Sequence, residues 1–177
     1  MVLPLPVRHL LVACVLAVTG ACQGPQPQRE MTVGVPPVVV ARTLLPTLCT
    51  DTSPEERAAV LNRLPRPLAV ERAERTVNAG KLSPRSVLAG VSIVLPAPPN
   101  ATPAWLQRVL TCHAADVALG KVPVMPDDPF SDVQTWLQMA ARSVGSTVVV
   151  QIEPMDRAEA GHVLERADRW GRFPVTP

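Results

Sequence analysis

The sequence predicts an α+β fold in its C-terminal half, a small antiparallel sheet with helices packed on one face. Apolar residues alternate along 87–95, as in a strand, and residues 102–120 carry the signals of an amphipathic helix. Two further strand-like segments and a last helix follow. The resulting β-α-β-β-α unit, at residues 86–171, is typical of a two-layer sandwich, and a helical hairpin is expected to precede it.

The N-terminus has the pattern of an export signal. Arg8 precedes the apolar run 10–18, which is too short to span a bilayer but has the length of a signal-peptide core. The next residues, Thr-Gly-Ala-Cys, end at Cys22 and resemble the lipobox of bacterial lipoproteins, where cleavage precedes a diacylglyceryl-modified cysteine. We therefore expect residues 1–21 to be a lipoprotein signal peptide and Cys22 to be lipidated. The alternative is secretion without a lipid.

Residues 22–45 are expected to form a Pro-rich tether and an extended segment. Gln, Gly and Pro dominate residues 23–28, which suits a tether rather than a core. Two prolines interrupt the apolar run 33–41, which favours extended chain or an edge strand. Gln23 after the lipidated cysteine is similar to lipoproteins of the outer membrane, so we expect the domain to face the periplasm there.

Residues 46–85 are predicted to form the helical hairpin. Ser53 and Glu56 make a capping box, with a proline between them at the first helical position. Two prolines end this helix, and the second of them, Pro67, can begin another helix that ends near Gly80. The charged residues are the solvated faces of amphipathic helices, so we expect packing rather than a site.

The helix after the first strand is the clearest in the sequence. Thr102 can cap it, Pro103 suits its first position, and Gly120 can take the left-handed conformation at its end. Between them, His113 falls within the apolar stripe, and Cys112 lies about 100° away at its edge.

Two strands and a helix complete the domain. Residues 133–142 and 147–153 are predicted strands, joined by a turn that contains Gly145. Pro154 is expected to begin a final helix with one apolar side, which ends at Gly171. The free face of the sheet is left for the N-terminal helices, solvent or a partner.

The composition and the missing motifs argue against several classes of function. The chain has 21 Pro, 2 Phe and no Tyr, so aliphatic side chains must fill the core. Its formal net charge is only +2, with scattered arginines, and stacking aromatics are scarce. These features argue against nucleic-acid binding. The sequence contains no phosphate-binding loop, G-x-S-x-G or H-E-x-x-H motif, so neither an enzyme nor a cofactor is predicted.

The cysteines indicate a disulfide. Exported proteins usually oxidise pairs of cysteines, and lipidation of Cys22 would leave Cys49 and Cys112 as the obvious couple. Their bridge would close a loop of about 60 residues and contribute about 4 kcal/mol in the chain-entropy model. Free thiols are the alternative.

Cys112 and His113 also suggest a metal or redox site, since thiolate and imidazole suit copper or zinc. Neighbours on a helix diverge too far to share an ion comfortably or to form a catalytic pair. A histidine on an apolar face is more often a core residue bonded to a backbone carbonyl. Asp127, Asp128 and Asp132 lack the ligand number and glycine of a calcium loop, so we expect them to cap turns.

A Leu-x-Cys-His-x-Ala pattern at residues 110–115, followed by Met125-Pro126 and by Val-Leu-Glu-Arg-Ala at 163–167, resembles a group of uncharacterised lipoproteins common in myxobacteria. The likeness covers about residues 87–170. It implies a lipid-anchored periplasmic domain with no known activity. Some of those relatives carry another cysteine after Met-Pro, where this chain has two aspartates.

We therefore expect a non-enzymatic, lipid-anchored envelope protein whose domain serves binding or scaffolding. Its expected partners are the membrane, through the N-terminal lipid, and another envelope protein. The alternative hypothesis is a periplasmic metal or redox binder that uses Cys112 and His113. A third is an enzyme, for which the sequence offers no set of acid, base and nucleophile.

Overall fold

Four antiparallel strands form one sheet in the computed structural model, which describes residues 35–78, 83–99 and 101–172. The strand order is β1-β2-β4-β3, so β2 and β4 are central. The strands are β1 Ala69–Val77, β2 Arg85–Pro96, β3 Leu137–Val144 and β4 Thr147–Pro154.

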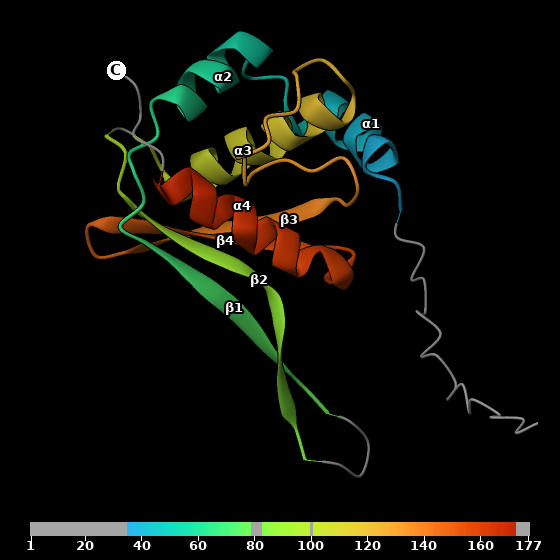
Figure 1. Cartoon of the computed structure of the whole chain (residues 1–177). Coiled ribbons are helices and arrows are strands. Elements are labelled where there is room, and N and C mark those ends of the chain that lie inside the picture. Colours follow the sequence, from blue (N-terminus) through green and yellow to red (C-terminus); the bar gives the residue numbers. More distant parts are fainter. Residues whose placement is uncertain (1–34, 79–82, 100, 173–177) are drawn as a thin grey trace, which may run out of the picture. The chain divides into compact units, whose positions relative to one another are not determined.

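Four α-helices lie within the described residues. They are α1 Pro37–Leu48, α2 Pro54–Asn62, α3 Pro103–Ala118 and α4 Ala160–Arg172, the last of which follows the short 3-10 turn η1 Arg157–Glu159. Figure 1 shows α3 and α4 on the same face of the sheet, and α1 and α2 pack against α3. The predicted α+β architecture, with helices on one face of an antiparallel sheet, is confirmed.

The core lies between the sheet and the two helices that cover it. Alternate residues of β2 and β4 point to this layer, as expected for strands with one buried face. They pack against apolar residues of α3 and α4. Fully buried members include Val91, Ile93, Leu95, Leu106, Leu110, Val150, Ile152 and Val163.

The opposite face of the sheet is mostly polar and carries no helix of the described chain. Ser92 pairs with Gln151 on it, and the salt bridge between Arg75 and Glu153 spans 2.7 Å there. The sequence allows the N-terminal helices to cover this face, but they pack on α3 instead.

Local signals correctly predict the start of α3 and the turn between β3 and β4. The Thr102 hydroxyl accepts a hydrogen bond from the Trp105 backbone N–H at 3.2 Å, and Pro103 is the first residue of α3. Gly120, past its end, has a φ of 69°, and Gly145 in the β3–β4 turn has a φ of 59°. Both values lie in the left-handed region that glycine adopts without strain.

The predicted helical hairpin is half correct. The capping box at the start of α2 is present, because the Ser53 N–H donates to the Glu56 carboxylate at 2.7 Å. The second helix, predicted from Pro67 to Gly80, is wrong: its described part forms strand β1 along the edge of the sheet. Val70 opposes Ile93 in that pairing. Pairing with β2 outweighs the helical spacing that the same residues also satisfy.

The expected extended segment is also wrong where the structure describes it. Residues from Pro37 onward form α1. Pro37 does not prevent this helix, because it is the first helical residue, where the missing N–H of a proline needs no partner. Ala41 of this helix is fully buried in the core. The signal peptide 1–21, Cys22 and the tether up to residue 34 lie outside the described residues.

Two predicted boundaries shift within the C-terminal unit. Strand β3 begins at Leu137 rather than at residue 133, opposite Pro154, which is the last residue of β4 and not the start of a helix. The final helix begins only after Asp156, whose carboxylate accepts from the Ala158 N–H at 3.0 Å and so begins η1. No helix of the described residues is long and apolar enough to cross a membrane.

Candidate functional site

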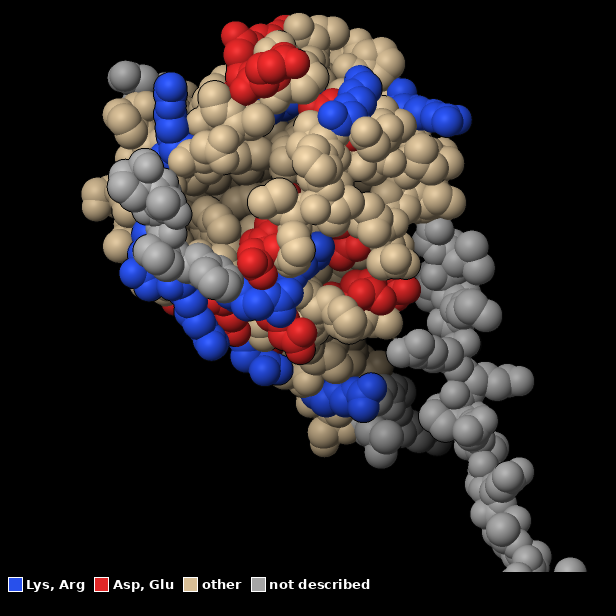
Figure 2. Space-filling view, turned by 45° about the horizontal axis from the view of Figure 1, so that its top comes forward, with Lys and Arg blue, Asp and Glu red and all other residues tan. Residues whose placement is uncertain are grey.

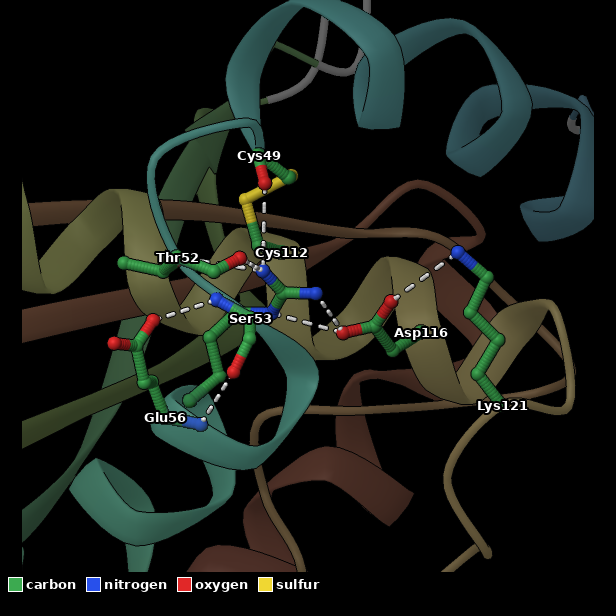
Figure 3. Close-up of polar contacts among 8 residues, drawn as sticks. Cys49, Thr52, Ser53, Glu56, Cys112, Asp116 and Lys121 are labelled. Atoms are coloured by element: carbon green, nitrogen blue, oxygen red, sulfur yellow. Dashed lines mark hydrogen bonds and ion pairs between the residues drawn. A yellow bond between two sulfur atoms is a disulfide. The ribbon is translucent and has the colours of Figure 1, made fainter.

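A disulfide joins the residue after α1 to the middle of α3. The sulfur atoms of Cys49 and Cys112 are 2.02 Å apart, and their Cα atoms are 5.6 Å apart, which is ordinary disulfide geometry. Figure 3 shows this bridge beside the polar contacts of the loop before α2. The predicted pairing is confirmed, and it crosslinks the N-terminal helices to the central one.

A buried ion pair lies one helical turn further along α3. The Arg57 side chain of α2 is 3% exposed and the Asp116 side chain is 1% exposed. Arg57 Nε donates to Asp116 Oδ2 at 2.8 Å, and Arg57 Nη1 donates to the Thr52 carbonyl. Lys121 Nζ is 3.9 Å from the other oxygen of Asp116 (Figure 3). The pair therefore fixes α2 against α3.

The structure does not bring Cys112 and His113 together as ligands. The Cys112 sulfur belongs to the disulfide and is not a thiolate, which is the form that binds a metal. The imidazole of His113 is hydrogen-bonded to Asp128. Within the described residues, no group of three His, Cys, Asp or Glu side chains could hold a metal ion. This arrangement does not support the metal or redox alternative.

His113 is bonded to a side chain rather than to the backbone carbonyl that the sequence suggests. Its Nε2 lies 2.7 Å from Oδ2 of Asp128, in the loop between α3 and β3. The same carboxylate accepts the Phe130 N–H at 2.9 Å and the Ser131 hydroxyl. The Asp128 carboxylate thus has three hydrogen-bond partners, one of which is the His113 imidazole.

The expectation that the aspartates cap turns is confirmed for two of them. Asp128 accepts from the backbone two residues later, and Asp132 does the same with the Gln134 N–H at 2.7 Å. Asp127 instead pairs with Arg169 of α4 at 2.8 Å. The loop is therefore attached both to itself and to α4.

The contacts of Asp128 change its acidity. Burial raises the pKa of its carboxyl, but the hydrogen bond and charge of His113 lower it, and so do the donors Ser131 and Phe130. The net result is a pKa below the ordinary value of 3.8, so Asp128 is ionised at neutral pH. An ionised carboxylate only accepts hydrogen bonds, so His113 Nε2 must carry the proton and donate it.

The His113 imidazole lines a pocket between α2, the loop after α3 and α4. The cavity has a volume of about 460 Å³, and we call it the His113 pocket. Figure 2 views the helix-covered side of the molecule, which is hollowed among uncharged side chains. The lining residues are Ala58, Leu61, Asn62, His113, Val122, Pro123, Met125, Pro126, Asp127, Asp128, Phe130 and Trp170.

The walls of this pocket are mainly apolar. Phe130 and Trp170 meet edge to face, with ring centroids 5.2 Å apart, a favoured aromatic geometry. Met125 is 59% exposed, although it belongs to a residue type that is usually buried. An open, mainly apolar cavity with a few polar side chains, here Asn62, His113, Asp127 and Asp128, has the usual composition of a small-ligand site.

His113 and Asp128 of the pocket, with Ser131 behind them, are the residue types of a hydrolytic triad, but they are not in a catalytic order. Asp128 lies between Ser131 and His113 and bonds to both. The Ser131 hydroxyl therefore donates to a carboxylate and not to the imidazole, and Ser131 is fully buried. A serine nucleophile needs the imidazole within hydrogen-bond reach. This geometry favours binding over acyl transfer.

Sequence reasoning missed the partners of Asp116 and His113. Both residues lie on the buried face of α3, where an ionisable side chain needs a partner. The presence of ionisable residues on this face therefore indicates that partners exist, but it does not identify them. Arg57, the partner of Asp116, is 59 residues away in the sequence.

Comparisons of the chain with protein-family models, with curated proteins and with solved structures found no match. The resemblance to myxobacterial lipoproteins stays a prediction.

Proposed function

We propose that the protein is a lipid-anchored envelope protein whose α+β domain binds a small, mainly apolar molecule in the His113 pocket. The observation that carries the proposal is the cavity itself, which is about 460 Å³ in volume and lined mostly by apolar side chains. Small-molecule sites have volumes of about 300–1,000 Å³ and combine such walls with a few polar groups.

The location in the envelope is supported by two features of the chain. Residues 1–22 have the pattern of a lipoprotein signal, and the Cys49–Cys112 disulfide is typical of an oxidising compartment such as the periplasm. In this proposal the lipid on Cys22 attaches the domain to the outer membrane, and the Pro-rich segment after it is the tether. Another envelope protein is the expected source or receiver of the ligand.

An apolar fluorescent probe tests the binding function. N-phenyl-1-naphthylamine is titrated into the purified protein, and an increase in its fluorescence that saturates is the expected result. Ala58→Phe places a ring in the pocket from α2 and should weaken binding at least tenfold. Ala59→Phe is the matched control, because Ala59 is the next residue of the same helix and lines a different depression.

Two outcomes would contradict the binding function. One is the absence of saturable binding to the native protein, and the other is an equal loss of affinity in both variants. Circular dichroism of both variants shows whether each has kept its fold.

Intact mass tests the anchor. Protein extracted from membranes should carry a diacylglyceryl group on Cys22, and Cys22→Ser should release the protein from the membrane fraction. A mature chain of unmodified mass in the soluble fraction would refute the anchor but leave the binding function standing.

A further inference from the structure

We propose that the molecule bound in the His113 pocket is an amine with an apolar body, an inference that rests on the proposed function above. The His113–Asp128 pair is the part of the pocket that would recognise the amine. Three properties of the described residues point to this chemistry: the available hydrogen-bonding atom, the charge of the lining and the shape of the walls.

The first property is the free nitrogen of the imidazole. Nε2 of His113 donates to Asp128, and Nδ1 has no hydrogen-bond partner among the described residues. In a neutral imidazole with the proton on Nε2, Nδ1 carries the lone pair and accepts hydrogen bonds. The group that complements it on a ligand is a donor, such as the N–H of an amine, and not a carboxylate.

The second property is the charge around the pocket. The lining contains two carboxylates and no lysine or arginine. Asp127 is neutralised by Arg169, and the neighbouring Asp132 is neutralised by Arg166 at 2.6 Å. Asp128 has no lysine or arginine partner within the described chain, and its partner His113 is charged only when it is protonated. A cation bound beside His113 would compensate this buried negative charge, whereas an anion would add to it.

The third property is the aromatic wall. Phe130 and Trp170 line the cavity together with Leu61, Val122 and Met125. Aromatic faces attract ammonium groups, and the aliphatic side chains accommodate the hydrocarbon part of a ligand. The pocket therefore suits an alkylamine or arylalkylamine better than an alcohol or a fatty acid of the same length.

Three probes of equal length test the inference: hexylamine, 1-hexanol and hexanoate, each titrated calorimetrically at pH 8 into the complete protein. We expect hexylamine to bind at least tenfold more tightly than hexanol, and hexanoate to bind most weakly. If hexanol or hexanoate binds as tightly as hexylamine, the inference is wrong, although the pocket remains a binding site. If the naphthylamine probe and all three hexyl compounds fail to bind, the proposed function itself fails.

A variant identifies the group responsible. Asp128→Asn removes the charge behind the imidazole and should reduce hexylamine affinity at least tenfold, while hexanol affinity changes less than twofold. Asp51→Asn is the matched control, because it removes an exposed carboxylate that pairs with Arg108 at 2.9 Å and does not line the pocket. An unchanged preference for hexylamine in Asp128→Asn would contradict the assigned role. Should this variant not fold, the comparison of the three probes with the native protein decides the question alone.

Discussion

Arg57 of α2 and Asp116 of α3 form an ion pair in which both side chains are buried. Asp116 lies one helical turn beyond Cys112 on α3. The disulfide and the ion pair therefore attach the N-terminal segment to one helix at adjacent turns. Because α2 supplies Ala58, Leu61 and Asn62 to the His113 pocket, these two links also fix one wall of the candidate site.

Loss of the disulfide should destabilise the protein substantially. The bridge spans 63 residues, and the chain-entropy model assigns a loop of that length about 4 kcal/mol. We expect Cys49→Ser combined with Cys112→Ser to lower the free energy of unfolding in urea by about 2–4 kcal/mol. Reduction of the native protein should have a similar effect. Equal denaturation midpoints with and without reductant would contradict a stabilising role.

Removal of one partner of the buried ion pair should be costly. Asp116→Ala leaves the Arg57 guanidinium without its carboxylate, and such changes cost about 3–5 kcal/mol. The double variant Arg57→Met with Asp116→Leu should recover most of this loss, because no charge is left buried. Asp51→Ala breaks the exposed pair with Arg108 and should change the free energy of unfolding by less than about 1 kcal/mol. Equal effects of the two aspartate variants would refute the assignment.

Gly90 should tolerate no side chain. An added Cβ would lie 2.0 Å from the carbonyl oxygen of Ile152, in the backbone of the adjacent strand. Gly90→Ala should therefore destabilise the sheet by several kcal/mol or prevent folding, as measured by thermal unfolding. Gly161→Ala is the control, because nothing lies within 4 Å of its Cβ on α4, and it should raise stability by about 0.5–1 kcal/mol. A tolerated Gly90→Ala would contradict the close approach of the strands.

Asp128 should make stability depend on acid pH. Because its pKa in the folded protein lies below the ordinary value of 3.8, ionised Asp128 stabilises the fold above that pH. This contribution should disappear as the pH falls through the lower pKa of the folded state. We expect the stability difference between the native protein and Asp128→Asn to shrink below about pH 4 in urea unfolding series. A difference that stays constant from pH 7 to pH 2.5 would contradict the shift.

Local signals were sufficient for some elements of the fold and not for others. Thr102 with Pro103, and Ser53 with Glu56, are helix starts whose chemistry is complete within a few residues. Strand β1 was not predictable in this way, because its residues also fit a helical spacing and the decision depends on pairing with β2.

The candidate site was only partly accessible to sequence reasoning. The sequence predicts that His113 is a buried histidine and that Asp128 is a turn residue. Their mutual contact depends on the path of the loop after α3, which no local pattern fixes. The disulfide could be predicted because cysteine pairing depends on compartment and on the number of cysteines.

The indole N–H of Trp170 gives the most direct test of ligand binding in the His113 pocket. The chain has 3 tryptophans, and of these only Trp170, on α4, lines this pocket. Trp105 lies in the first turn of α3, and Trp136 is buried just before β3. In a nitrogen-15 correlation spectrum, addition of hexylamine should shift the Trp170 indole signal in a saturable manner and leave the other two in place. An unmoved Trp170 signal at saturating amine, or a larger shift at Trp105, would contradict the account.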